Sequence, residues 1–402
     1  MGRYLIYFSY FGTRYSGVQS RKGVLVKGSP LKTISGALEE ALKRLRPSNE
    51  IGVTVSSRTD KGVHAVKNSC HVDLVYPSDG KCYSSDVVTN VMNTYLVNHG
   101  EDIRVLQTRQ VPDTFNSRFG AKYRRYVYRL GHTPDVQYGQ QDASGNIDPF
   151  VRKSRKHFHK RSRFVVGEPL CTLDSCKTGI YNYRLDINKL ISAADMVSGI
   201  HNYTSFTATT KDKYGYVPNP VKLLTIGVKR GQPFGHQLQK HGMNVTDKIE
   251  FWDVHVMSKS FLYKQIRRLV GSMVLVARNT ISLDDLRDIL NNPRKDFRFA
   301  GQMTASESGL FLLDVGYDPK DLEFVPTEET EATSDINQAA YVDVHNQNER
   351  IENKLHLYNH TDDAENDIFI EDCDVNSSPP SSKFYSTVVK IDPCLVEVSK
   401  SS

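Results

Sequence analysis

The sequence has no long hydrophobic run, no close pair of cysteines and no glycine motif for nucleotides. No stretch approaches the roughly 18 consecutive apolar residues of a membrane helix, so we expect no membrane span. The six cysteines are scattered without a C-x-x-C pair, which argues against structural zinc and favours reduced thiols inside a cell. P-loop and dinucleotide-binding patterns are also absent. We therefore expect an intracellular protein, cytoplasmic or mitochondrial, that uses no metal and no cofactor.

Charge is distributed unevenly along the chain. Residues 319–402 contain 18 Asp and Glu against 6 Lys and Arg, whereas residues 1–318 contain 28 against 46. A basic body is expected of a protein that neutralises phosphates, although surface lysines also serve solubility. The acidic segment is rich in Asn, Ser and Thr and has few apolar periodicities, so it is predicted to be a disordered tail.

Hydrophobic periodicity predicts an α+β fold in two halves, residues 1–110 and 111–318, with mainly antiparallel sheets flanked by helices. The first half has predicted strands at 4–10, 52–55, 70–74 and 103–108, and predicted helices at 34–45 and 85–96. The second half has predicted strands at 123–130, 223–228 and 251–257, a helix at 187–197 and a long helix from about residue 261.

A long insertion, residues 131–180, interrupts the second half. It carries seven Lys or Arg between Arg152 and Arg163. A run of this kind can bind RNA, act as a nuclear address or form a solvated loop. Its charge alone leaves these alternatives open.

A polar loop between two predicted strands, residues 57–65, concentrates charged side chains. A carboxylate such as Asp60 can act as a nucleophile or a general base when cations keep it ionised, and Arg58 and Lys61 are the local cations. The alternative is an Asx-type turn ahead of Gly62, in which Asp60 bonds its own backbone and does no chemistry. The residues taken alone favour the turn.

A comparison with known motifs gives the same loop a different interpretation. Residues 58–65, RTDKGVHA, resemble the active-site signature of the tRNA pseudouridine synthase A family. Four further segments resemble that family in the same order: YFGTRYSGVQ at 10–19, FNSRFGAKYRRYVY at 115–128, SFLYKQIRRLVGS at 260–272 and ESGLFL at 307–312. Serines 56 and 57 and residues 260–263 are similar to its animal tRNA pseudouridine synthase-like 1 branch. The resemblance spans residues 4–317.

The resemblance implies the pseudouridine synthase fold around a central RNA-binding cleft. It also implies a cofactor-free isomerisation of uridine, in which the N1–C1′ bond breaks and C5 bonds to C1′. Asp60 takes the position of the essential carboxylate, with attack at C1′, attack at C6 and a glycal route left open. Arg58 braces the space that the extruded base leaves, Tyr126 and Leu310 enclose the uracil, and Arg267 pairs with Asp60. Read without the resemblance, Tyr126 is a core tyrosine and Arg267 a solvated helix residue.

The expected partner is tRNA or another structured RNA. Its phosphates are predicted to contact Arg118, Lys122, Arg124 and Arg125, and the resemblance adds a homodimer. Phe11 and Lys222 stand where the family usually has Asp and Arg, and these departures concern RNA docking more than chemistry.

Two rival functions remain. One is a noncatalytic RNA-binding protein or tRNA-folding factor on the same scaffold. The other is a scaffold protein that recruits partners through its acidic tail and basic insertion.

Overall fold

A computed structural model describes residues 1–19, 32–78, 81–134, 176–181, 183–208, 220–233, 249–294 and 299–324. Contacts divide the chain into two compact units, Met1–Asn346 and Gln347–Ser402, and every described residue belongs to the first. The basic run at 152–163 and the acidic tail beyond residue 324 lie outside the described residues.

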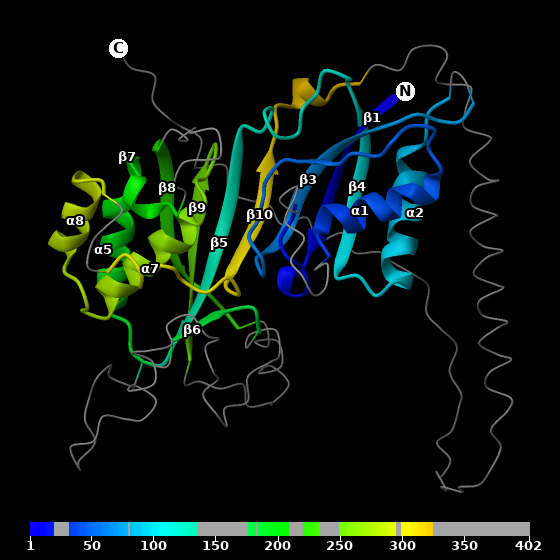
Figure 1. The fold of residues 1–402 in the computed structure, drawn as a ribbon. Coiled ribbons are helices and arrows are strands. Elements are labelled where there is room, and N and C mark those ends of the chain that lie inside the picture. The colour runs from blue at the N-terminus through cyan, green and yellow to red at the C-terminus, as the bar shows by residue number, and fades with distance from the viewer. Residues whose placement is uncertain are drawn as a thin grey trace, which may run out of the picture. The chain divides into compact units, whose positions relative to one another are not determined.

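Ten strands of the described chain form one sheet (Figure 1). The strands are β1 (Gly2–Tyr10), β2 (Thr54–Val55), β3 (His64–Leu74), β4 (Ile103–Val111), β5 (Tyr123–His132), β6 (Gly179–Tyr181), β7 (Gly199–Asn202), β8 (Val221–Arg230), β9 (Glu250–Ser258) and β10 (Leu310–Gly316). Their order is β4-β1-β3-β10-β5-β9-β8-β7, with β2 beside β3 and β6 beside β5. All pairs are antiparallel except β3–β10 and β5–β6, which confirms a mainly antiparallel sheet. The β3–β10 pair joins the strands of the two predicted halves.

The helices pack on this sheet in two groups. The helices α1 (Ile34–Leu42) and α2 (Ser85–Asn98) lie beside β1, β3 and β4, whereas α5 (Ile187–Val197), α7 (Gln265–Ala277) and α8 (Leu283–Asn291) lie beside β7, β8 and β9 (Figure 1). Helix α1 begins at Thr33, whose hydroxyl accepts a hydrogen bond from the Gly36 amide. None of the described helices is long and apolar enough to cross a membrane.

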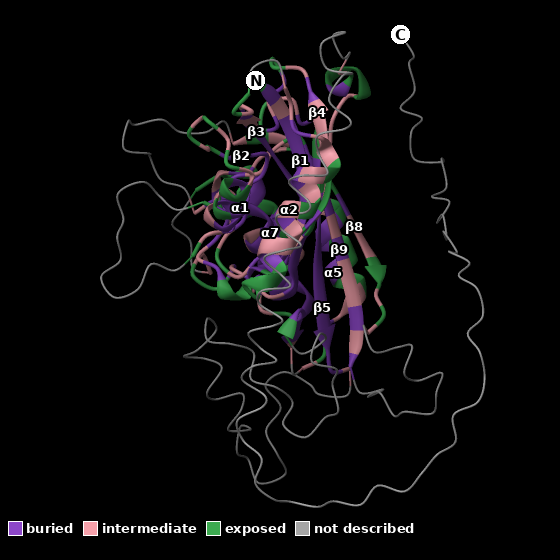
Figure 2. Cartoon of the chain, turned by 90° about the vertical axis from the view of Figure 1, so that its right-hand side faces the viewer, coloured by how far each residue is buried: buried purple, intermediate pink, exposed green. Residues whose placement is uncertain are grey.

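One row of buried side chains crosses the sheet from one group of helices to the other. Tyr10, Ala65, Leu312, Tyr126 and Val256 are successive cross-strand neighbours, so their side chains share one face. All five belong to the main hydrophobic core together with residues of the five helices. The burial colouring of Figure 2 shows the buried interior between helices and strands.

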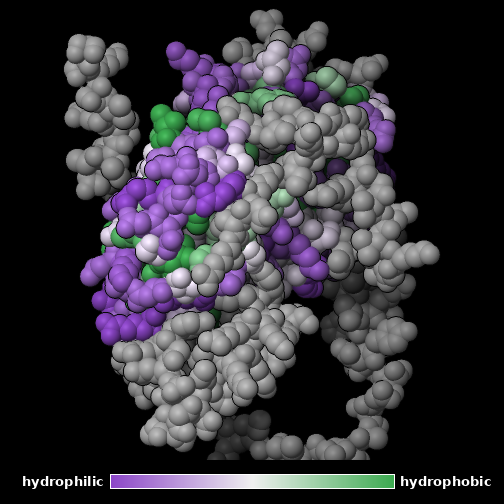
Figure 3. All heavy atoms as spheres, turned by 60° about the vertical axis from the view of Figure 1, so that its left-hand side comes forward, coloured by the Kyte–Doolittle hydropathy of each residue, from purple (hydrophilic) through white to green (hydrophobic). Residues whose placement is uncertain are grey.

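The opposite face of the sheet carries a smaller core. Leu5 and Tyr7 of β1 pack there with Leu322, which lies in a short 3₁₀ helix, Pro319–Leu322. The folded chain therefore extends past residue 318, where the sequence predicted the tail to begin. On the side drawn in Figure 3 the described surface is mostly hydrophilic, with small separate apolar patches.

Helix α7 begins later than its sequence pattern predicts. Lys264 has φ 59°, a left-handed conformation that is not helical, and α7 starts at the next residue. The Gln265 side chain accepts a hydrogen bond from the Leu262 amide at 2.7 Å, which satisfies a donor at this turn. The first turn of α7 thus has a defined position above the sheet, and Arg267 lies in it.

Candidate active site

Residues 56–63, here called the Asp60 loop, connect β2 to β3. Asp60 to Val63 form a turn in which the Val63 amide donates to the Asp60 carbonyl at 3.2 Å, and Gly62 has φ 82°. Gly17, at φ 121°, lies so close behind the loop that a Cβ there would be 3.2 Å from the Thr59 carbonyl oxygen. Gly62 therefore permits the turn, and Gly17 permits the close packing of its own segment against the loop.

Hydroxyl groups and one side-chain amide fix the loop to three strands of the sheet. The Ser57 and Tyr126 hydroxyls are 2.7 Å apart, the Tyr10 hydroxyl is 2.8 Å from that of Thr59, and the Asn68 amide donates to the Ser57 carbonyl at 3.0 Å. Burial raises the pKa of Tyr126 to about 12, so its phenol stays protonated at neutral pH. The loop is thereby anchored to β1, β3 and β5.

Asp60 lies beside a single arginine that a second carboxylate also uses. Its Oδ2 is 3.5 Å from Nη1 of Arg267, while Arg267 Nη2 is 2.9 Å from Oε2 of Glu307. The side chains of Asp60 and Arg267 are 22% and 11% exposed. Burial raises the pKa of the Asp60 carboxyl above its ordinary value, although Arg267 and Lys264 act in the opposite direction. Two carboxylates thus share one nearly buried guanidinium.

The position of Arg267 follows from how α7 packs. A Cβ on Gly271 would be 1.8 Å from the Met303 carbonyl oxygen, so this glycine lets the helix lie against the segment before β10. The Arg267 carbonyl accepts from the Ala305 amide at 2.9 Å, and Arg267 Nε donates to the Ala305 carbonyl at 2.8 Å. Backbone contacts therefore aim the guanidinium at Asp60 and Glu307.

Glu307 has no role in the sequence prediction, although the motif at 307–312 contains it. It is the one acidic residue between 301 and 313, in a segment that otherwise lacks charge. Its side chain also packs on the turn of the Asp60 loop, because a Cβ on Gly62 would be 2.6 Å from Glu307 Cγ. An isolated acid beside an apolar strand was the signal that could have revealed it.

Leu310 and Tyr126 lie on the same face of the sheet in adjacent cross-strand rows. Leu310 pairs with Tyr128, and Leu312 pairs with Tyr126. Tyr126 is 5% exposed and Leu310 is 6% exposed, and the ring of Phe261 meets Tyr126 edge-on at 5.2 Å. The structure thus brings these two predicted uracil contacts onto one face of the sheet, where other side chains bury both of them.

The predicted RNA contacts do not form one group. Arg124 is buried, and its guanidinium donates to the carbonyls of Ser56 at 2.7 Å, Arg118 at 2.9 Å and Lys259. Arg124 therefore braces the Asp60 loop from inside instead of facing solvent. Arg58 and Arg118 are exposed.

The other two predicted RNA contacts, Lys122 and Arg125, do not lie beside the Asp60 loop in the same way. Lys122 forms ion pairs with Asp318 at 3.7 Å and Asp321 at 3.5 Å. Arg125 is exposed and alternates with Tyr126 along β5, so it points to the opposite face of the sheet. The structure thus separates Arg125 from the face on which Tyr126 lies.

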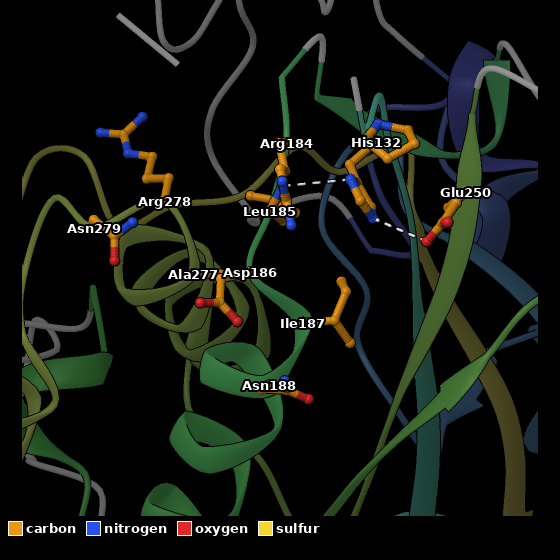
Figure 4. Close-up of a pocket in the computed structure, with 11 residues that line it drawn as sticks. His132, Arg184, Leu185, Asp186, Ile187, Asn188, Glu250, Ala277, Arg278 and Asn279 are labelled. Carbon is orange, nitrogen blue, oxygen red and sulfur yellow. Dashed lines mark hydrogen bonds and ion pairs between the residues drawn. The ribbon is translucent and has the colours of Figure 1, made fainter. Parts of the chain in front are cut away.

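A polar hollow of about 800 Å³ lies at the other end of α7 (Figure 4). It is lined by His132, Arg184, Glu250, Arg278 and the start of α5. His132 accepts from the Leu185 amide at 3.3 Å and is 3.5 Å from Glu250, and burial lowers its pKa. Arg278 follows Arg267 by eleven residues, which is about 16 Å along a helix. The hollow is therefore separate from Asp60.

A metal site is not evident in the part of the chain that the structure describes. No three His, Cys, Asp or Glu side chains there are arranged to hold an ion. The chemistry available at Asp60 is that of one carboxylate, one shared arginine and the surrounding hydroxyl groups.

Comparisons with known proteins give one consistent result. The profile of a family described as tRNA pseudouridine synthase matches residues 193–318. The tRNA pseudouridine synthase-like 1 of Xenopus laevis is 31% identical over 332 residues, which cover 83% of this chain and 97% of that one. The human protein of the same name is 30% identical, covering 78% and 90%, and tRNA pseudouridine synthase A of Brucella ovis is 27% identical, covering 79% and 98%.

Proposed function

Because the chain belongs to the tRNA pseudouridine synthase family, we propose that Asp60 is the essential carboxylate of its uridine isomerisation. In that reaction the N1–C1′ bond of the uridine breaks and C5 bonds to C1′, so the atoms of substrate and product are the same. The observation that carries the proposal is the Asp60–Arg267 contact of 3.5 Å on a loop anchored to three strands. A residue in a purely structural turn would not require a buried arginine aimed at it.

Arg267 keeps Asp60 in its working state. Burial favours the neutral carboxyl, whereas reaction as a nucleophile or as an electrostatic partner requires the carboxylate. Arg267 and Lys264 lower the pKa of Asp60 and so oppose burial. The attacked atom, C1′ or C6, and the glycal route stay open, because all three begin from an ionised Asp60.

Glu307 acts as a positioning residue for Arg267. Its contact with Nη2 is shorter than the contact of Asp60 with Nη1, 2.9 Å against 3.5 Å. Arg267 is therefore held by Glu307 and the Ala305 carbonyl, and Asp60 is not locked in a bidentate pair. This arrangement leaves the Asp60 oxygens available to the substrate.

The target uridine must leave its stack to reach Asp60. We expect Tyr126 and Leu310, which are buried, to enclose the uracil and Arg58, which is exposed, to occupy the vacated space. Because Tyr126 and Leu310 are almost fully buried, the uracil reaches them only after the side chains above them move. Phe261, edge-on to Tyr126, is the neighbour we expect to move.

RNA is held by the exposed basic residues around the loop, among them Arg118, whose carbonyl shares Arg124 with the carbonyl of Ser56. Lys122 joins it if RNA displaces Asp318 and Asp321. We expect the affinity for tRNA to fall steeply with added salt. A central cleft and a homodimer remain parts of this proposal, and sedimentation of the purified protein tests the second. Family membership disfavours the noncatalytic rival.

The proposal is tested with a tRNA transcript that carries tritium at uracil C5, because forming the C5–C1′ bond releases that tritium. We expect release by the wild type and a loss of at least roughly a thousandfold in Asp60→Asn. Release by Asp60→Asn at the wild-type rate would refute the role of Asp60. No release by the wild type, despite tight binding of tRNA, would favour the noncatalytic rival.

Asp60→Asn is expected to remain folded. Burial raises the pKa of Asp60, so this group contributes stability below its unfolded pKa and loses it as pH rises through the folded pKa. At neutral pH the ionised group therefore adds no stability to the fold, and Asn removes its charge. The variant should therefore melt no lower than the wild type at pH 7, which separates lost chemistry from lost folding.

A further inference from the structure

Four large aromatic side chains are exposed in the described part of the chain: Phe11 at 41%, Phe119 at 75%, Tyr123 at 36% and Tyr263 at 43%. Tyr123 lies on the sheet face opposite Tyr126 and donates a hydrogen bond to Asp314. The other three lie in irregular segments outside the sheet. Singly exposed apolar side chains are common on protein surfaces, so the meaning of these three depends on where they lie.

Each of the three segments is linked to the Asp60 loop or to the strand that follows it, by a hydrogen bond, through a shared arginine or by electrostatics. Next to Phe11, the Gly12 amide donates to Nδ1 of His64 at 3.0 Å, just past the loop. Next to Phe119, the Arg118 carbonyl shares the Nη2 atom of Arg124 with the carbonyl of Ser56, the first residue of the loop. Next to Tyr263, Lys264 acts on the Asp60 carboxyl itself. The three aromatic residues thus come from distant parts of the sequence, and each is next to a residue that is linked to the loop or to the start of β3.

Each of the three rings also has a cation over it. Lys177 Nζ is 4.5 Å from the Phe11 ring centre, Arg118 Cζ is 5.4 Å from that of Phe119, and Lys264 Nζ is 5.3 Å from that of Tyr263. Each of the three rings therefore has a positive charge close to it. A ring with a neighbouring cation can take a nucleobase on its face and the attached phosphate on the cation.

The most exposed ring stands on a fixed loop. The Asn116 side chain accepts from the amides of Arg118 at 3.0 Å and Phe119 at 3.1 Å, and its carbonyl accepts from the Gly120 amide at 2.8 Å. Local bonds of this kind hold the backbone in one conformation. The backbone that carries the Phe119 ring is therefore fixed before a ligand binds, and little backbone entropy is lost on binding.

We propose that Phe11, Phe119 and Tyr263, the three aromatic platforms, stack unpaired nucleobases that flank the target uridine. The inference rests on the proposed assignment of the Asp60 loop as the active site. The ligand is single-stranded or looped RNA, because bases inside a duplex have no free face to offer. The platforms hold the nucleotides on either side of the uridine while Asp60 acts on it.

The test compares Phe11→Leu, Phe119→Leu and Tyr263→Leu, which keep an apolar side chain but remove the aromatic face. Binding of a fluorescent tRNA transcript is measured by anisotropy at several salt concentrations. We expect each substitution to weaken binding on the order of tenfold. Phe119→Tyr should bind like the wild type, because it restores a ring. Tyr95→Leu is the matched control, since Tyr95 on α2 also has a cation over its ring, Arg44 at 4.9 Å, but lies on no segment that contacts the loop.

The outcomes separate stacking from other causes. Wild-type binding by all three leucine variants would overturn the proposal, and so would an equal loss in Tyr95→Leu. A smaller salt dependence in the leucine variants would also overturn it, because it would mean that a phosphate contact had been lost instead of a stack. Binding does not require turnover, so this result stands apart from tritium release, which tests the role of Asp60.

Discussion

The two ends of helix α7 look alike in composition but differ in how their groups are connected. At its start, Arg267 contacts two carboxylates that lie far apart in the sequence, Asp60 and Glu307. At its end, Arg278 donates to Thr280 and Gln302 and lines a hollow of about 800 Å³. The hollow thus lies at one end of α7, and the arginine that two carboxylates share lies at the other. A nearly buried guanidinium in contact with two carboxylates, more than the presence of a hollow, marks the reactive end.

Among substitutions that compare the two ends of α7, the largest effect is expected from Arg267→Lys. Lysine keeps one positive charge but not the planar fork that reaches Asp60, Glu307 and the Ala305 carbonyl together. We expect single-turnover tritium release to fall on the order of a hundredfold, with tRNA affinity little changed. Turnover at the wild-type rate would show that the start of α7 does not take part in the reaction.

Glu307→Gln tests how the two carboxylates share Arg267. The charge of Glu307 raises the pKa of Asp60, so its removal should lower that pKa and move the acid limb of the rate profile to lower pH. Arg267, Lys264 and Tyr126 also face Asp60, with Arg58 and Lys61 on its own loop, and this substitution leaves them unchanged.

We expect the rate on the pH plateau to fall on the order of tenfold, because Arg267 loses its nearer anchor. Glu40→Gln is the control, since Glu40 pairs with Lys43 on the surface of α1. An acid limb that stays in place or moves to higher pH would contradict the shared-arginine geometry.

Gly62→Ala tests whether the backbone of the Asp60 loop needs a glycine beside Glu307. A methyl group at Gly62 meets the Glu307 side chain at 2.6 Å, in a conformation with φ 82°. We expect a loss of about 1–2 kcal/mol in unfolding free energy, together with slower turnover because Glu307 is displaced. Gly52→Ala is the matched control, because nothing lies within 4 Å of its added carbon. Denaturant titration of both variants measures the difference, and equal stabilities would argue against this packing.

The smallest effect is expected at the other end of α7. Arg184 lines the hollow beside His132 but is exposed and far from Asp60. Arg184→Ala should leave tritium release within about twofold of the wild type, because surface substitutions away from special features have small effects. A large loss of turnover in this variant would break the distinction between the two ends.

Local patterns explain which parts of the fold were predictable from sequence. The α5 helix at 187–197 and the Thr33 start of α1 follow from apolar spacing and a capping residue, and the structure has both. The β3–β10 pair joins residues 64–65 to 311–312, a contact that no local pattern encodes. The short strands β6 and β7 and the helix α8 were not predicted. Pairing with distant strands decides β6 and β7, whereas α8 has a local signal that was missed, the capping box of Ser282 and Asp285.

The candidate site also has parts that the sequence predicted and parts that only the fold reveals. The motif resemblance pointed to Asp60, Arg267, Tyr126 and Leu310, which the structure brings onto one side of the sheet, while their roles stay predictions. It did not show that Arg124 is buried against the Ser56 carbonyl, because charge suggests exposure and only the fold places carbonyls around a guanidinium. Glu307 was not predicted for a similar reason, since its partner Arg267 lies forty residues away along the chain.

The most direct test of the account is a crystal structure of Asp60→Asn bound to its tRNA. The account predicts an extruded uridine whose C1′ or C6 lies about 3–3.5 Å from the side chain of residue 60, with its uracil between Tyr126 and Leu310. A nucleotide seated instead in the hollow beside His132, with the start of α7 unoccupied, would contradict it.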